Sequence, residues 1–315
     1  MALLEPLVNA KLSPVTKKIY LDRWKVLNTA FNEDIDIIIM EPEKYIKWIK
    51  KTYNSLPTQK SYISAILTIF RYNPEFKKKN IKIYEQWYEE FKKIHGEIDG
   101  ILKQNAPTKR QKDAYVPFEK IVKKRDELTK GSFERLILAF YTYIPPLRCD
   151  LNKVRIYTEK DLKDKHFEKD CKADKQDSHL EECDSKKENY VLLDTKKHTG
   201  KLILNEYKTA HSLNKYEKEL PKELISELEE SLKRYDREYL FVDRRGEPYI
   251  ANSYTRYVNR ILQKLFETKI TVSLIRHAYI NTLDFNKLTI QEKEDIAKDM
   301  AHSVDTQARY KWMNF

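Results

Sequence analysis

The sequence predicts a mainly α-helical protein of two domains, the second containing a small antiparallel β-sheet. Three observations lead to this prediction. The 315 residues are enough for one large or two ordinary domains. Most apolar residues recur three or four positions apart, the spacing typical of helices. A polar, basic and proline-broken stretch at 104–112 separates two such regions. We therefore expect a helical domain over 1–103, a linker over 104–112 and a second domain over 113–315.

The first domain is expected to contain four main helices. Ser13 followed by Pro14 is typical of a helix start, and Asn73 followed by Pro74 stops a helix. The helices are expected to begin near Pro14, Pro42, Thr58 and Ile81. The last of them carries Tyr84, Tyr88 and Phe91 at helical spacing, so we interpret these aromatic residues as core and not as base-stacking platforms.

The second domain is expected to open and close with helices around a short sheet. Its expected helices lie at about 117–129, 132–143, from 221, from 253, at 272–283 and from a capping box at 289–292. Weakly alternating segments predict strands at 154–157, 190–193, 201–207 and 216–220. Between the first two strands, residues 159–190 are almost without apolar side chains. This segment is expected to be a solvated insertion.

Composition excludes several classes of protein. Mean hydropathy is −0.73 and no apolar run approaches 18 residues, so neither a membrane span nor a secretory signal is expected. Three cysteines imply no disulfide framework and suit a reducing, intracellular compartment. The five glycines are isolated, which argues against phosphate-binding and dinucleotide-binding loops.

The charge distribution points to nucleic acid. The chain carries a net charge of +11, of which residues 1–112 hold +8, whereas the segment 159–190 carries −3. A basic chain with 37 aromatic residues is typical of a nucleic-acid-binding protein, although lysine-rich helices can also be plain solvated surface. Lys109, Arg110 and Lys112 of the linker are expected to lie along a phosphate backbone.

Four short segments of the second domain resemble the motifs of one family. They are PPLRCD around Arg148, LNEYKTA around Lys208, SLIRHAY around Arg276 and MAHSVDTQARY over 300–310. Together they resemble the tyrosine recombinases, also called the phage-integrase family. The chain looks most similar to the branch found in large DNA viruses of eukaryotes and related mobile elements. The resemblance covers 113–315, and the helical domain 1–103 is similar in size and helicity to the family's DNA-clamping domain, which implies that it binds DNA.

The resemblance implies a DNA-cleaving and DNA-joining enzyme. Tyr310 would attack a DNA phosphate to give a 3′-phosphotyrosine, inside a pocket formed by Arg148, Lys208, Arg276 and His302. Such an enzyme needs no metal, ATP or other cofactor. Its partner would be double-stranded DNA, on which it would form a homo-tetramer, with no membrane and no small-molecule substrate involved. It would act in the nucleus or at a viral replication site.

The residue types suit that chemistry. Transfer of a phosphodiester to a hydroxyl passes through a state with extra negative charge on the phosphate oxygens. Two guanidinium groups present paired donors to such oxygens and never lose their charge. Arg148 and Arg276 are the candidates, with Asp150 in support. An ordinary ion pair between Arg148 and Asp150 is the alternative explanation.

The other roles rest on less distinctive residues. Lys208 would give the leaving 5′ oxygen its proton, with Lys197, Lys201 and Lys215 as nearby competitors. His302 would donate to a phosphate oxygen, although a histidine at a helix C-terminus is also favoured by the helix dipole.

The sequence departs from the family pattern at several positions. Ser273 stands where the family usually has a histidine, three residues before the second arginine. A hydroxyl can donate one hydrogen bond there but carries no charge. His277 could partly substitute, yet it points about 100° away on the helix and better suits packing. A type IB topoisomerase and a catalytically inactive DNA-binding protein therefore remain alternatives.

One metal site is conceivable. His166, Cys171, His179 and Cys183 fall within eighteen residues and could bind zinc, but their spacing is irregular. We favour the interpretation without a metal.

Overall fold

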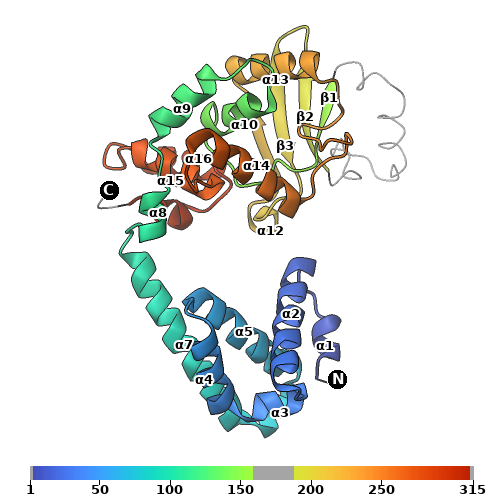
Figure 1. The fold of residues 1–315 in the computed structure, drawn as a ribbon, viewed down its shortest axis with the longest axis vertical. Helices are drawn as coiled ribbons and strands as arrows, with labels where there is room; N and C mark the ends of the chain where they lie inside the picture. Colours follow the sequence, from blue (N-terminus) through green and yellow to red (C-terminus); the bar gives the residue numbers. More distant parts are fainter. Residues whose placement is uncertain (1–2, 159–187, 313–315) are drawn as a thin grey trace. The chain divides into compact units, whose positions relative to one another are not determined.

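The computed structural model describes residues 3–158 and 188–312. The chain divides into two compact units, Met1–Gln104 and Asn105–Phe315, each with its own hydrophobic core (Figure 1). The mainly α fold with a small sheet is confirmed. In the described ranges, no helix combines the length and apolar character needed to cross a membrane.

Several helices of the first unit begin at a proline that directly follows a polar residue. The Ser13 hydroxyl accepts a hydrogen bond from the amide of Thr16 at 3.1 Å and caps α2, as its Ser-Pro start predicts. Trp87 is fully buried, and its indole Nε1 donates to the carbonyl of Ile39 at 2.9 Å. The helices are α1 Glu5–Val8, α2 Pro14–Phe31, α3 Ile35–Met40, α4 Pro42–Thr52, α5 Leu56–Tyr72, α6 Pro74–Lys79 and α7 Ile81–Lys103.

The aromatic residues of α7 do not all belong to the core. Trp87 and Ile94 are its buried residues, whereas Tyr84 and Phe91 are half-buried and Tyr88 is 40% exposed. The interpretation of all these rings as core was wrong for Tyr88. A 23-residue helix packed against neighbours on one side leaves the flanks of its apolar stripe open.

The second unit alternates helices with a four-stranded sheet. The end of the expected linker 104–112 is helical instead, in the helix Lys109–Asp113, because Thr108 and Gln111 form a capping box. The helices are α8 Lys109–Asp113, α9 Phe118–Glu127, α10 Phe133–Thr142, α12 Ala210–Leu213, α13 Lys222–Arg234, α14 Ala251–Phe266, α15 Val272–Thr282, α16 Ile290–Asp299 and α17 Val304–Ala308. The strands are β1 Val154–Thr158, β2 Asn189–Asp194, β3 Thr199–Leu204 and β4 Tyr216–Glu219.

The sheet is mixed, so the expectation of a purely antiparallel sheet is wrong. Its order is β1-β2-β3-β4, with β1 parallel to β2 and the other two pairs antiparallel. A parallel pair needs a long connection between its strands, and the charged insertion supplies that length. Residues 159–187 of that insertion lie outside the described residues.

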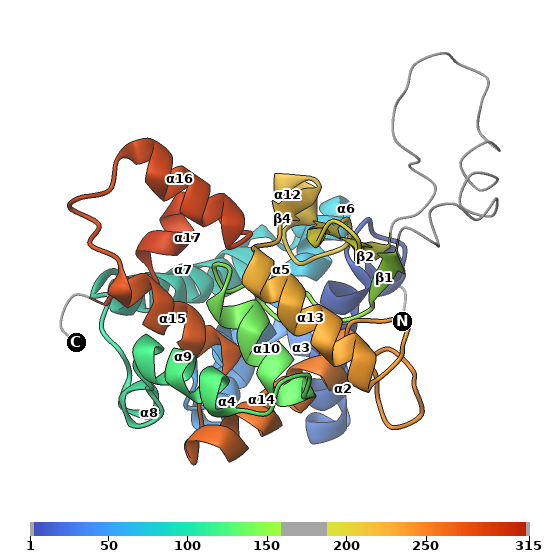
Figure 2. The ribbon, with the colours of Figure 1, turned by 90° about the horizontal axis from the view of Figure 1, so that it is seen from above.

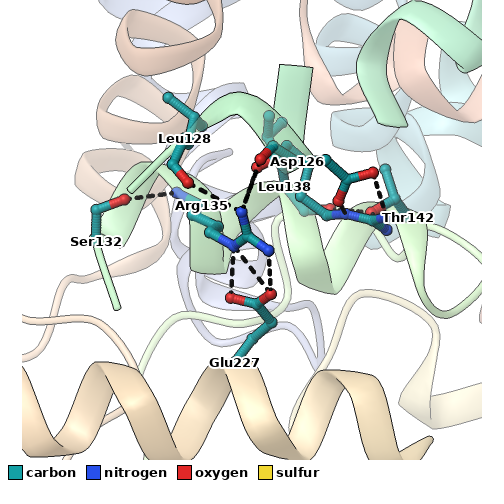
Figure 3. A network of polar contacts seen from close by, with 8 residues as sticks. Asp126, Leu128, Ser132, Arg135, Leu138, Thr142 and Glu227 are labelled. Carbon is teal, nitrogen blue, oxygen red and sulfur yellow. Dashed lines mark hydrogen bonds and ion pairs between the residues drawn. The ribbon is translucent and has the colours of Figure 1, made fainter. Parts of the chain in front are cut away.

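A buried ion pair joins the helices α10 and α13. Arg135 on α10 donates from Nη2 to the Glu227 carboxylate on α13 at 2.7 Å (Figure 3). Its Nη1 donates to the main-chain carbonyls of Arg125, Asp126 and Leu128, at the end of α9. Figure 2 shows α9, α10 and α13 side by side. This network fixes α10, whose C-terminal end runs through Pro146 to Arg148.

Candidate active site

A buried arginine lies at the centre of the candidate site. Arg276 on α15 is 1% exposed, and its Nη1 donates to the carbonyls of Pro146 at 2.6 Å and Met300 at 3.1 Å. Its Nε has no partner, and it forms no ion pair with any described carboxylate. Burial lowers the pKa of its guanidinium. The nearby buried Asp150 acts on this guanidinium only at longer range. A buried cation without a direct ion pair is costly, so an anion bound here would stabilise it.

The second group is a neutral histidine with a free donor. Arg276 Nη2 donates to His302 Nδ1 at 2.7 Å, so the ring proton must sit on Nε2. That Nε2 is buried and has no hydrogen-bond partner among the described residues. Burial, followed by the charges of Arg276 and Arg148, lowers the pKa of His302 to about 3. The ring therefore offers one unsatisfied N–H at neutral pH.

The second arginine reaches the same turn of the chain. Arg148 Nη1 donates to the carbonyl of Ala301 at 2.7 Å. Asp150 is 9% exposed and accepts from the main-chain amide of Lys208 at 3.4 Å, and burial raises its pKa. Within the described residues, Arg148 and Asp150 form no ion pair, so the alternative explanation for this arginine is not observed.

A turn in the left-handed conformation brings these groups together. Ala301 has a φ of 51°, and the amides of Ala301 and His302 donate back to the carbonyls of Lys298 and Ala297. This arrangement is a Schellman motif that ends α16. It exposes the carbonyls of Met300 and Ala301 to Arg276 and Arg148, and Thr209 Oγ1 also donates to Ala301 at 2.9 Å. The turn thus sets the spacing of both arginines and of His302.

Tyr310 lies against the same groups. Its ring centroid is 5.5 Å from that of His302, with the planes 30° apart, and 4.9 Å from Arg276 Cζ. The short helix α17, capped by Ser303, carries the chain from His302 to this tyrosine. The candidate nucleophile is therefore beside the candidate anion site.

Helix α15 also holds the chain around Tyr310. His277 Nδ1 donates to the main-chain carbonyl of Tyr310 at 2.9 Å, and the imidazole stacks on Trp312 at 4.3 Å. One turn later, Asn281 Oδ1 accepts from the amide of Trp312 at 3.1 Å. Burial lowers the pKa of His277 to about 4. Sequence reasoning had assigned His277 to packing and had missed Asn281, although the two lie four residues apart and so share one helix face.

The remaining candidate residues make few contacts with the arginines and His302. Lys208 is exposed on the turn after β3, and only its backbone amide reaches the cluster, through Asp150. Ser273 is exposed on α15, and in the described chain it forms no hydrogen bond with the arginines or His302. Lys109, Arg110 and Lys112 are exposed on α8 and form no ion pair within the described ranges.

No metal centre is evident in the described ranges. They hold no group of three histidine, cysteine, aspartate or glutamate side chains that could bind a metal ion. The four residues of the conceivable zinc site, His166, Cys171, His179 and Cys183, lie outside the described residues.

The arrangement can bind a tetrahedral anion. Two guanidinium groups and one neutral N–H converge, and a phenol lies next to them. A phosphate diester would satisfy the unpaired Arg276 Nε and His302 Nε2.

No family model matches the sequence, and no curated protein matches it. Among solved structures, the chain is similar to one described as the crystal structure of XerA recombinase. That similarity has a TM-score of 0.40 and 15% sequence identity, and covers 100% of this chain and 94% of that chain.

Proposed function

We propose that this chain is a tyrosine-recombinase-type enzyme that cuts and rejoins double-stranded DNA through a 3′-phosphotyrosine bond to Tyr310. One observation carries the proposal. Arg276 is buried and forms no direct ion pair with a described carboxylate, and it lies against both the unsatisfied N–H of His302 and the ring of Tyr310. A phosphodiester is the anion that best suits these groups, because the phenol of Tyr310 can attack its phosphorus atom.

In the first step the Tyr310 oxygen forms a bond to phosphorus and the bond from phosphorus to the 5′ oxygen breaks. Arg148, Arg276 and His302 Nε2 donate to the non-bridging oxygens, where negative charge grows. The phenol proton passes to water. Because His302 is neutral, it acts as a hydrogen-bond donor and not as an acid. In the second step a 5′ hydroxyl attacks the phosphotyrosine and releases Tyr310, so that no ATP is consumed.

Lys208 is proposed to protonate the leaving 5′ oxygen. It stands on an exposed turn, from which a long side chain can reach bound DNA. Lys208→Ala should slow cleavage of ordinary DNA, and a substrate with a 5′ bridging sulfur should restore the rate, since a thiolate leaves without a proton. If the same substrate also restored the cleavage rate of Arg276→Ala, the rescue would not be specific to a missing proton donor. That result would remove support for Lys208 as the proton donor.

The finer features are part of the same proposal. The chain would act as an integrase of the viral or mobile-element branch and would assemble as a homo-tetramer on DNA. Residues 1–103 would bind duplex DNA as a separate domain, joined at 104–112 to the catalytic domain 113–315. Lys109, Arg110 and Lys112 would contact backbone phosphates. Ser273 would donate its hydroxyl to the phosphate, so Ser273→His should keep or raise the cleavage rate.

A nicked suicide substrate tests the proposal, because the short product strand diffuses away and traps the covalent complex. Mass spectrometry should locate the nucleotide adduct on Tyr310. Tyr310→Phe should abolish the adduct and leave DNA binding unchanged, whereas Tyr279→Phe is the matched control and should still form it. An adduct on another tyrosine would overturn the assignment. DNA binding with no adduct would indicate an inactive DNA-binding protein, and relaxation of supercoils without joining of two sites would indicate a topoisomerase.

A further inference from the structure

The first unit carries an open groove between α2, α5, α6 and α7, with a volume of about 650 Å³. Aromatic rings form much of its wall, and its charged residues are all cations. The aromatic residues are Tyr20, Phe70, Tyr84, Tyr88 and Phe91. The cations are Arg71, Lys77 and Lys78, and none of the described residues that line the groove is acidic. We call it the aromatic groove.

Three of the rings form a parallel row along α7. The centroids of Tyr84 and Tyr88 are 5.7 Å apart, and those of Tyr88 and Phe91 are 6.3 Å apart, with planes only 10° apart in both pairs. The Lys77 ammonium lies 3.8 Å from the centroid of Tyr84. Flat apolar faces and positive charge therefore alternate within one groove.

The fold accounts for Tyr84 and Phe91, which pack against the core of the first unit, but it does not account for Tyr88. Tyr88 is 40% exposed, although Trp87 beside it fills the core. In the described part of the chain, Arg71, Lys77 and Lys78 form no ion pair. A second groove of the same unit is different, because its Lys50 pairs with Glu90 at 2.6 Å. Three cations without an ion pair, one of them over the Tyr84 ring, together with the exposed ring of Tyr88 indicate a partner that is both anionic and flat.

We propose that the aromatic groove binds single-stranded nucleic acid, with bases stacked on the ring row and phosphates on the three cations. Cations alone would suit any phosphate backbone, including that of a duplex. The row of rings is what separates the two cases, because the faces of paired bases are hidden in a duplex and become available only in an unpaired strand. This proposal does not depend on the proposed cleavage reaction, since every residue in it belongs to the first unit.

Fluorescence anisotropy with the full-length protein tests the proposal. The probes are labelled ten-nucleotide oligo(dT), oligo(rU) of the same length, and a blunt-ended duplex without unpaired bases. Tyr88→Ala should weaken oligo(dT) binding about 5- to 150-fold, the range found when a base loses its stacking partner. Tyr88→Phe keeps the ring and should bind as the wild type does. Tyr235→Ala, which removes a tyrosine 39% exposed in the second unit, is the matched control.

The cations provide a second measurement. Lys77→Gln and Lys78→Gln should each reduce the slope of log affinity against log salt by about 0.7 for the single strand. Comparable loss with oligo(rU) would show that the groove accepts either sugar, and loss with oligo(dT) alone would assign it to DNA. Both results support the proposal.

Several outcomes would overturn it. One is single-strand binding that Tyr88→Ala leaves unchanged, and another is equal weakening of single strand and duplex. Binding to phosphatidylserine vesicles that Tyr88→Ala removes would assign the groove to a membrane surface. Self-association in sedimentation that the same change abolishes would assign it to a second copy of the chain. A thermal melt of each variant confirms that the protein is folded, and the Tyr310 adduct, measured separately, reports on cleavage alone.

Discussion

The imidazole of His277 donates its Nδ1–H to the main-chain carbonyl of Tyr310 at 2.9 Å, while the adjacent Arg276 faces the ring of the same tyrosine at 4.9 Å. One helix, α15, therefore supplies both the cation of the anion site and the hydrogen bond that fixes the candidate nucleophile. Neighbouring residues of a helix point about 100° apart, so the segment around Tyr310 wraps past two sides of α15. In the proposed reaction, the separation of the Tyr310 oxygen and the phosphate would depend largely on this helix.

Loss of the His277 donor should slow cleavage without weakening DNA binding. His277→Phe keeps a ring to stack on Trp312 but cannot bond the Tyr310 carbonyl, and we expect at least a tenfold lower rate of adduct formation. His277→Asn, which retains an N–H, should recover part of that rate. Single-turnover trapping on the suicide substrate gives the rates. Hydrogen exchange at the amides of 310–312 should rise in His277→Phe, and unchanged exchange together with an unchanged rate would contradict the positioning role.

Arg276 should contribute to stability as well as to chemistry. Arg276→Ala leaves the carbonyls of Pro146 and Met300 without their donor, so we expect the free energy of unfolding to fall by about 2–4 kcal/mol. Arg148→Ala removes a half-buried side chain with one hydrogen bond and should cost about 1 kcal/mol. Urea denaturation separates the two values. Each variant should also lose about a hundredfold or more in cleavage rate.

Acid should destabilise the second unit through its buried histidines. Burial lowers the pKa of His277 to about 4 and of His302 to about 3, whereas their ordinary value is 6.5. The unfolded chain therefore binds protons that the folded chain does not, and the stabilisation present above pH 6.5 is lost as the pH falls toward these values. His277→Gln should flatten the dependence of Tm on pH between pH 7 and 5. His198→Gln, at an exposed histidine, should leave that dependence as it is in the wild type.

The turn at Ala301 should be improved by glycine. A residue with a Cβ is disfavoured at a φ of 51°, so Ala301→Gly should raise the free energy of unfolding by up to about 1 kcal/mol. The matched control is Ala297→Gly, inside α16, which should lower it by about 1 kcal/mol or more. Chemical denaturation measures both changes. A loss of stability in Ala301→Gly would mean that packing of the Ala301 methyl group stabilises the fold by more than the backbone strain destabilises it.

Removing one partner of the Arg135–Glu227 ion pair should lower the free energy of unfolding more than replacing both partners with apolar residues. Glu227→Leu leaves a buried guanidinium unpaired, and we expect a loss of about 3–5 kcal/mol. Adding Arg135→Met should restore part of it, because no buried charge is then left without a partner. Denaturation of the wild type, both single variants and the double variant completes the cycle. A double variant less stable than Glu227→Leu would show that the hydrogen bonds from Arg135 to the carbonyls at the end of α9 stabilise the protein more than an unpaired buried charge destabilises it.

By itself, the sequence determined the longer helices and the separate basic and charged segments, but not the short helices such as α3 and α6. Apolar spacing and local start signals such as Ser13-Pro14 act within a few residues, so they are legible in a linear chain. The capping box at Thr108 and Gln111 is local too, yet the polar composition around it obscured the helix α8. The parallel pairing of β1 and β2 was missed because strand direction depends on where a long connection returns the chain.

The candidate site was accessible from the sequence only as a set of residue types. Tertiary structure decided that Arg276 donates to His302 and not to a carboxylate, that this fixes the proton on Nε2, and that His277 bonds the backbone of Tyr310. It also decided that Tyr88 lies on an open groove while Trp87, one residue earlier, is in the core. Periodicity specifies which side of a helix is apolar. Which part of that side is covered, and which donor meets which acceptor, depends on contacts between segments far apart in the chain.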